Sequence, residues 1–186
     1  MRFIFIHGYK SSPEKNFWPW LRHELQAQGH EVVAPELPNP EAPSVEEWIK
    51  AMLDATRVLT DQDIIVGHSL GGALALRFLE AAEARTTPHA CLLISTPWNI
   101  KDERFAGFFL TEFDFEVLMW RASKFCVLHA VDDTVIPVAH AKRYADIFHA
   151  ELITPENGGH FNAEEYPIIR DTALHLATEP FVYNPG

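Results

Sequence analysis

Residues 63–71 read Asp63-Ile64-Ile65-Val66-Gly67-His68-Ser69-Leu70-Gly71, and an alanine- and leucine-rich segment follows them. The first half is a short apolar run typical of a buried strand, and the second half is a Gly-x-Ser-x-Gly turn that opens a helix. Glycines let the backbone bend sharply enough to hold a serine hydroxyl out at the tip of a sheet. The stretch therefore predicts a nucleophile elbow at Ser69, with a tight turn lacking chemistry as the alternative.

Further short apolar runs lie on both sides of this stretch. With residues 64–66, they cover residues 3–6, 31–34, 91–94, 125–128 and 151–153. Most are continuously apolar, which favours strands of a parallel sheet that is covered on both faces. Helical patterns lie between them, at about residues 16–29, 44–53, 71–83, 138–149 and 164–177. The order predicts an α/β fold with a mostly parallel sheet of about six strands and helices on both faces.

Two of these helices have clear boundary signals. Ser44 followed by Glu47 matches a capping box, which places the start of the second helix at Ser44. The first helix is expected to tolerate Pro19 in its first turn and to end at Gly29.

Length and charge limit the function classes. The chain has 186 residues and a formal net charge of −11, and we expect one domain over residues 1–186. Such a charge without a basic cluster disfavours nucleic acids and membrane surfaces as partners.

The apolar run near the N-terminus is too short for a signal peptide, which points to the cytoplasm. Cys91 and Cys126 lie inside apolar runs, where free thiols behave as small buried hydrophobes.

A serine nucleophile needs a base and a group that orients the base. Asp133 follows the run at residues 125–128, and His160 follows the run at residues 151–153 behind Gly158 and Gly159. The chain order of serine, aspartate and histidine is that of α/β-hydrolases. We therefore predict Ser69 as nucleophile, Asp133 as orienting acid and His160 as base, with no cofactor and no metal.

Each assignment has an alternative. Asp132 competes for the role of the acid. Asp133 is preferred because it lies four residues before Pro137, where α/β-hydrolases usually place the acid, and Asp132 is expected to cap the turn. For His160, the alternative is a loop histidine on a solvated glycine turn.

The oxyanion of the tetrahedral intermediate needs backbone donors, and we expect the amides of Leu70 and Tyr9 to be those donors.

Two more histidines lie near these motifs. His7 lies just before the expected Tyr9 donor and His68 just before Ser69, so either could be mistaken for a catalytic base. We expect both to pack and hydrogen-bond within the structure.

At this point the sequence resembles a known family. The resemblance rests on the segments Ile6-His7-Gly8, Trp18-Pro19-Trp20-Leu21, Ala34-Pro35-Glu36-Leu37-Pro38-Asn39-Pro40, Glu47-Trp48 and Gly67-His68-Ser69-Leu70-Gly71. Over nearly its whole length, the chain is similar to the retinoblastoma-binding protein 9 family of small serine hydrolases. The resemblance implies a compact α/β-hydrolase without a large lid domain and a triad of Ser69, Asp133 and His160.

One property of that family does not transfer. Its retinoblastoma-binding member is associated with a Leu-x-Cys-x-Glu peptide. Neither Cys91 nor Cys126 has a leucine two residues before it, so this partner is not expected here.

Aromatic residues are dense between the runs at residues 91–94 and 125–128. They could form a short cap over a substrate pocket, for which we name Trp18, Trp98, Phe108 and Phe109, or they could belong to short helices packed on the sheet. The expected function is hydrolysis of a small carboxylic ester, with a small acyl compound as substrate. The alternatives are a thioesterase or peptidase with the same triad, and a non-catalytic interaction protein on this fold.

Overall fold

The structure is a computed structural model, and it describes residues 1–179. One sheet holds six strands in the order β2-β1-β3-β4-β5-β6, and each neighbouring pair is parallel. The strands are β1 (Arg2–Ile6), β2 (Glu31–Val33), β3 (Asp63–His68), β4 (Ala90–Ile94), β5 (Phe125–Leu128) and β6 (Glu151–Ile153). The predicted parallel sheet is confirmed.

Helices connect the strands. They are α1 (Trp18–Ala27), α2 (Val45–Thr56), α3 (Leu70–Ala81), the short 3-10 helix η1 (Glu103–Phe105), α4 (Ala106–Phe109), α5 (Phe115–Leu118), α6 (Ala139–Phe148) and α7 (Pro167–Thr178). The last helix begins three residues later than expected, because Pro167 lacks an amide hydrogen and suits the first turn. Half of the expected capping box forms, since the Ser44 hydroxyl oxygen accepts from the Glu47 amide at 3.3 Å. Among the described residues, no hydrogen bond joins the Ser44 amide to the Glu47 carboxylate, and the Ser44 hydroxyl donates to Glu46 instead.

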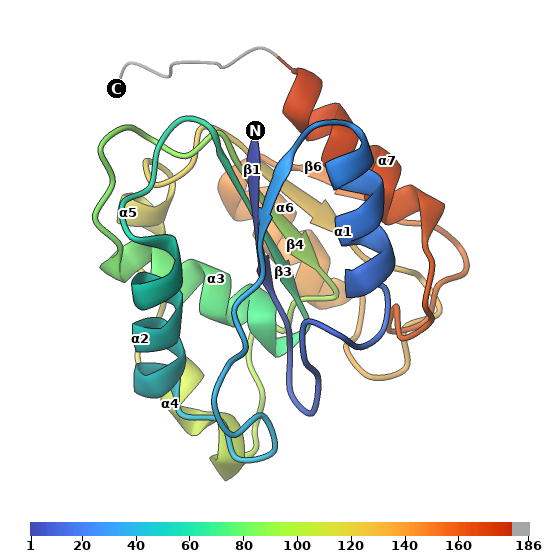
Figure 1. The fold of residues 1–186 in the computed structure, drawn as a ribbon. Coiled ribbons are helices and arrows are strands. Elements are labelled where there is room, and N and C mark those ends of the chain that lie inside the picture. Colours follow the sequence, from blue (N-terminus) through green and yellow to red (C-terminus); the bar gives the residue numbers. More distant parts are fainter. Residues whose placement is uncertain (180–186) are drawn as a thin grey trace.

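Alternation of side chains along the strands explains their continuously apolar sequences. In β1, Phe3 and Phe5 belong to one buried cluster while Ile4 and Ile6 belong to the other. Helices α1 and α7 cover the first face of the sheet, and α2, α3 and α6 cover the second, as the ribbon shows for α1, α7, α2 and α3 (Figure 1). Since both faces are covered, every position of the inner strands β3, β4 and β5 is buried.

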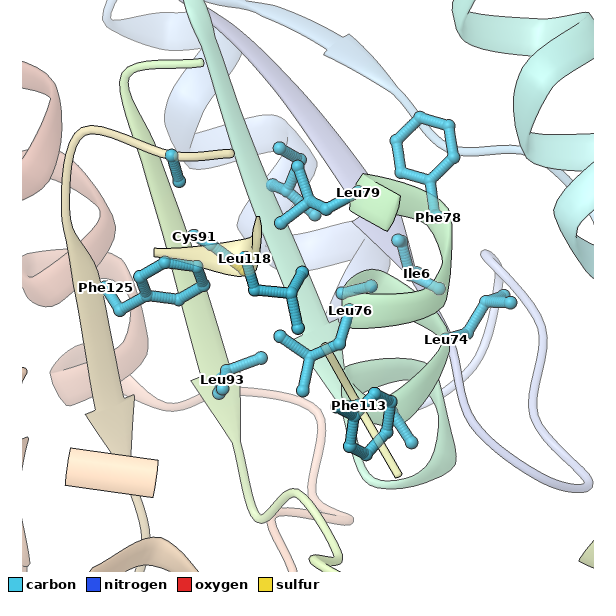
Figure 2. Packing of buried hydrophobic residues seen from close by; sticks show 14 of the residues in the cluster. Ile6, Leu74, Leu76, Phe78, Leu79, Cys91, Leu93, Phe113, Leu118 and Phe125 are labelled. Carbon is cyan, nitrogen blue, oxygen red and sulfur yellow. The ribbon is translucent and has the colours of Figure 1, made fainter. Parts of the chain in front are cut away.

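The segment between β4 and β5 packs on the second face. Phe113 and Leu118 lie beside Leu76 and Leu93 in the buried cluster (Figure 2). The segment is therefore an extension of the core that carries only short helices, and no large lid is present within residues 1–179. Helices in this described range are also too short or too polar for any of them to cross a membrane.

Candidate active site

Ser69 is the single residue between β3 and α3. Its φ of 56° and ψ of −128° lie outside the regions that side-chain-bearing residues favour, and this costs about 1–3 kcal/mol. Two backbone hydrogen bonds of 2.9 Å hold it there: the Ser69 amide donates to the Ile94 carbonyl, and the Gly72 amide donates to the Ser69 carbonyl. The elbow predicted from the sequence is present, and it projects the serine from the carboxyl edge of the sheet.

The glycines of the elbow allow close backbone contacts. A Cβ at Gly71 would lie 2.1 Å from the Ile6 carbonyl oxygen, and a Cβ at Gly67 would lie 2.6 Å from the Gly71 carbonyl oxygen. Both distances are far below van der Waals contact. Glycine is therefore required for α3 to begin directly against the end of β1, which brings the loop after β1 next to Ser69.

The three residues predicted as a triad meet at this edge, although long stretches of chain separate them. The Nε2 atom of His160 lies 2.9 Å from Ser69 Oγ, and its Nδ1 lies 2.9 Å from Asp133 Oδ2. A carboxylate can only accept, so the proton of a neutral His160 is on Nδ1. Its Nε2 is then free to accept the hydrogen of the serine hydroxyl.

Asp133 has a dense set of donors. Its Oδ1 accepts from the amides of Val135 at 2.8 Å and Ile136 at 2.9 Å, and its Oδ2 accepts from His160. Burial alone would raise the pKa of Asp133, but the hydrogen bonds from His160 and the Ile136 amide outweigh burial and lower the pKa to about 2. The carboxylate is therefore ionised throughout the neutral range.

The structure corrects the expectation for Asp132. Asp133 caps its own turn, whereas Asp132 accepts a hydrogen bond of 2.7 Å from the Gly159 amide in the loop that carries His160. The physical reason is the sheet order: β5 and β6 are neighbours, so the loops that follow them touch. The two aspartates thus hold the same loop: Asp133 binds the side chain of His160, and Asp132 binds the backbone amide of Gly159.

Comparisons with known proteins identify the family of this chain. Residues 3–166 match the family model described as serine hydrolase. The chain belongs to the serine hydrolase family. YdeN of Bacillus subtilis is 30% identical over 176 residues, with 89% of this chain and 90% of YdeN covered. The serine hydrolase RBBP9 of Rattus norvegicus is 26% identical over 159 residues, with 83% of each chain covered.

Solved structures place this serine hydrolase in the α/β-hydrolase fold. The crystal structure of the Bacillus subtilis ydeN gene product has a TM-score of 0.88 and 27% identity, with 96% of this chain and 99% of that chain covered. Alpha/beta hydrolase domain-containing protein 10 from mouse has a TM-score of 0.65 at 18% identity, with 94% and 88% covered, and it shows the fold alone. The resemblance inferred from the sequence is confirmed at the level of family and fold.

The two backbone amides expected as oxyanion donors in this serine hydrolase belong to Leu70 and Tyr9. Leu70 is the first residue of α3, so its amide has no partner within the helix. Within residues 1–179, the Tyr9 amide donates to no other group. Tyr9 follows Gly8, whose Cβ, if present, would lie 3.1 Å from the Cβ of Ser69 and 3.4 Å from the Leu70 nitrogen. The loop after β1 therefore approaches both the nucleophile and the first residue of α3.

His7 has the structural place that we expected. It is buried, and its Nε2 accepts from the Leu37 amide at 3.2 Å while its Nδ1 lies 3.0 Å from the Gly8 carbonyl oxygen. Burial lowers the pKa of His7, which keeps the ring neutral in this arrangement.

The four aromatic residues named for a substrate pocket separate into two pairs. Trp98 and Phe109 line a hollow of about 290 Å³. Its other lining residues are Asn99, Thr111, Glu112, Phe113, Phe115 and Ile147. Trp18 is fully buried on the other face of the sheet, and Phe108 is 1% exposed against the Trp48 ring. These two positions are corrected: their core packing excludes them from a pocket surface.

Arg77 was not anticipated from the sequence. Its guanidinium donates to three backbone carbonyls of the aromatic segment, those of Phe108, Thr111 and Glu112. It also pairs with Glu80 at 2.8 Å, and Glu80 accepts from the Asp114 amide at 2.8 Å. Because Arg77 and Glu80 belong to α3, the helix that begins at the nucleophile also anchors the segment that lines the hollow. The sequence signal that could have indicated this role is the position of Arg77, a charged residue, within the strongly apolar sequence of α3.

His129 was also missed. It follows β5 directly and is fully buried, and its Nε2 lies 2.8 Å from the Ile136 carbonyl oxygen and 3.4 Å from Asp133 Oδ2. Burial lowers the pKa of His129, so the neutral ring donates from Nε2 to the Ile136 carbonyl. A polar residue at the carboxyl end of a buried strand could have indicated this position.

Proposed function

We propose that this chain hydrolyses small carboxylic esters through an acyl-enzyme intermediate on Ser69. The observation that carries the proposal is the continuous chain of hydrogen bonds from Ser69 Oγ through His160 to Asp133, each of 2.9 Å. Such a chain activates a hydroxyl that is otherwise a poor nucleophile at neutral pH. Membership of the serine hydrolase family supports hydrolysis as the reaction type.

The proposed reaction has two halves. In the first, Ser69 Oγ attacks the carbonyl carbon while its proton passes to His160 Nε2. The carbonyl oxygen becomes an oxyanion, for which the Tyr9 and Leu70 amides are the proposed donors. Losing a single donor of this kind costs about 3 kcal/mol of transition-state stabilisation. The bond to the leaving alkoxide then breaks, and His160 returns the proton to that alkoxide, which departs as the alcohol.

In the second half, water attacks the acyl-Ser69 carbonyl and gives a proton to His160 Nε2. The bond between the carbonyl carbon and Ser69 Oγ breaks, and His160 protonates Ser69 as the carboxylic acid leaves. Asp133 keeps its negative charge throughout, because its pKa of about 2 lies far below neutral pH. It orients His160 and stabilises the imidazolium that forms twice in each turnover.

We include an apolar acyl or aryl group of the substrate in the proposal. Trp98 and Phe109 line a hollow that such a group would fit, although no triad residue lines that hollow. The net charge of −11 supports a neutral ester over an acidic one, and it equally supports the absence of nucleic-acid and membrane partners. We include a cytoplasmic location in the proposal, which fractionation of cells that produce the tagged protein will test.

A fluorophosphonate probe tests the proposal, with the modified residue identified by mass spectrometry. We expect labelling at Ser69 in the wild type, none in Ser69→Ala, and strongly slowed labelling in His160→Ala. Activity is then measured on p-nitrophenyl acetate, butyrate, octanoate and benzoate, and on a thioester and an anilide that share the preferred acyl group. Faster turnover of the thioester or the anilide would reassign the substrate class. Absence of labelling in the folded wild type would favour the non-catalytic interaction protein.

A further inference from the structure

His68 connects the strand that carries the nucleophile to the loop that carries the base. It is the last residue of β3, and its Nε2 lies 2.8 Å from the backbone carbonyl oxygen of His160. A carbonyl oxygen can only accept, so Nε2 carries a hydrogen and donates it. The His68 ring also lies against the His160 ring, with centroids 5.0 Å apart, and it makes a T-shaped contact with the Phe17 ring, with centroids 5.4 Å apart.

The charge state of His68 suits this position. Its side chain is 2% exposed. Burial, followed by the repulsion of a positive charge on His160, lowers the pKa of His68 to about 3. The ring is therefore neutral near pH 7. A neutral donor holds the carbonyl without placing a second positive charge beside the imidazolium that the proposed reaction forms on His160.

The loop around His160 has an irregular backbone. Three of its residues have positive φ angles: Gly158 at 158°, Gly159 at 54° and Phe161 at 51°. Besides His68, two other groups hold the backbone of this loop: Asp132 accepts from the Gly159 amide, and the Tyr166 hydroxyl donates to the Gly158 carbonyl at 3.3 Å. Asp133 holds the His160 ring, and Phe161 of the loop is itself buried. Of these contacts, the one from His68 ties the loop to the residue that directly precedes Ser69 in the sequence.

We propose that His68 is a positioning residue that sets the distance between His160 Nε2 and Ser69 Oγ by holding the His160 backbone to the end of β3. The inference rests on the proposed function, because it assigns His68 a part in that same reaction. An error of about 1 Å in the place of a catalytic group can lower a rate by about 100-fold. A residue that served packing alone would be replaceable by any side chain of similar shape.

The test compares His68→Phe with His68→Gln. Phenylalanine keeps an aromatic ring against Phe17 but has no donor, while the glutamine amide reaches about as far as Nε2 and keeps one. We expect His68→Phe to lower kcat for a p-nitrophenyl ester by about 10- to 100-fold with KM changed by less than about 2-fold. His68→Gln should stay within about 5-fold of the wild type. If His68→Phe does not fold, His68→Asn replaces it, because the asparagine amide is too short to reach the carbonyl.

The outcomes separate this inference from the proposed function. If His68→Phe keeps the full activity of the wild type, the role of His68 is overturned and the proposed function stays intact. Equal losses in the Phe and Gln variants, with melting temperatures equal to each other, would overturn it as well, since the donor would then not matter. A folded wild type that reacts neither with the ester nor with the fluorophosphonate would overturn both.

Discussion

Replacing Asp133 by asparagine changes only the chemistry of one buried group. The amide oxygen of the asparagine can still accept from the Val135 and Ile136 amides, as Asp133 Oδ1 does at 2.8 and 2.9 Å. Its NH₂ group would then face His160 Nδ1, where the wild type has Oδ2 at 2.9 Å. A donor at that place favours the tautomer with the hydrogen on Nε2, which cannot accept the proton of Ser69.

The expected loss is large in activity and moderate in stability. Loss of the correct tautomer and of the negative charge lowers kcat by about 10⁴-fold, which corresponds to ~5.4 kcal/mol. The pKa of Asp133 is lowered from 3.8 to about 2, so its ionised form contributes about 2 kcal/mol to folding at neutral pH. The variant should therefore remain folded at 25 °C.

The assay is hydrolysis of a p-nitrophenyl ester at pH 7, with urea denaturation as the measure of folding. Asp132→Asn is the matched control. It keeps an oxygen for the Gly159 amide, which Asp132 accepts at 2.7 Å, and should retain activity within about 3-fold. The reasoning fails if Asp133→Asn keeps more than about a tenth of the wild-type kcat, or if Asp132→Asn loses more activity than Asp133→Asn does.

Three further predictions concern folding. Between pH 6.5 and about pH 4, the free energy of unfolding of the wild type should fall by about 3 kcal/mol through His68, because His68 has a pKa near 6.5 in the unfolded chain and about 3 in the folded chain. Urea denaturation at several pH values should show a smaller fall in His68→Gln. Arg77→Ala should lower the free energy of unfolding by about 2 kcal/mol and speed proteolysis within residues 108–114. The control is Lys50→Ala, which removes only an exposed ion pair and should change neither quantity measurably. Gly71→Ala should cost about 3 kcal/mol in urea denaturation, since its Cβ would meet backbone oxygens that cannot move away; an unchanged midpoint would contradict the close packing of α3 on β1.

Much of the architecture could be predicted because it depends on local pattern. Runs that are apolar at every position require cover on both faces, and the alternation of Phe3, Ile4, Phe5 and Ile6 between two clusters is the physical basis of that pattern. Ser69, Asp133 and His160 could be named because each follows a different strand of a parallel sheet, whose carboxyl ends share one edge.

Other features depend on packing and leave little trace in the sequence. Aromatic content alone does not show whether a ring faces a hollow, as Trp98 does, or the core, as Trp18 does. The contacts of Arg77 with the segment between β4 and β5 could not be predicted, because its partners there are backbone carbonyls, which every residue has. The partner of Asp132 was missed because it depends on which loops become neighbours at the sheet edge.

The alternation of side chains along the strands also determines what the two thiols can do. Cys126 is paired in register with Leu92, the neighbour of Cys91, so the two cysteines are on adjacent strands. They nevertheless face opposite sides of the sheet, Cys91 toward α3 and α6 and Cys126 toward α1 and α7. An intramolecular disulfide is thereby excluded in the native fold. Each thiol is instead a chemical reporter on one helical layer, and the order in which the two react with an alkylating reagent under partial denaturation would reveal which layer detaches first.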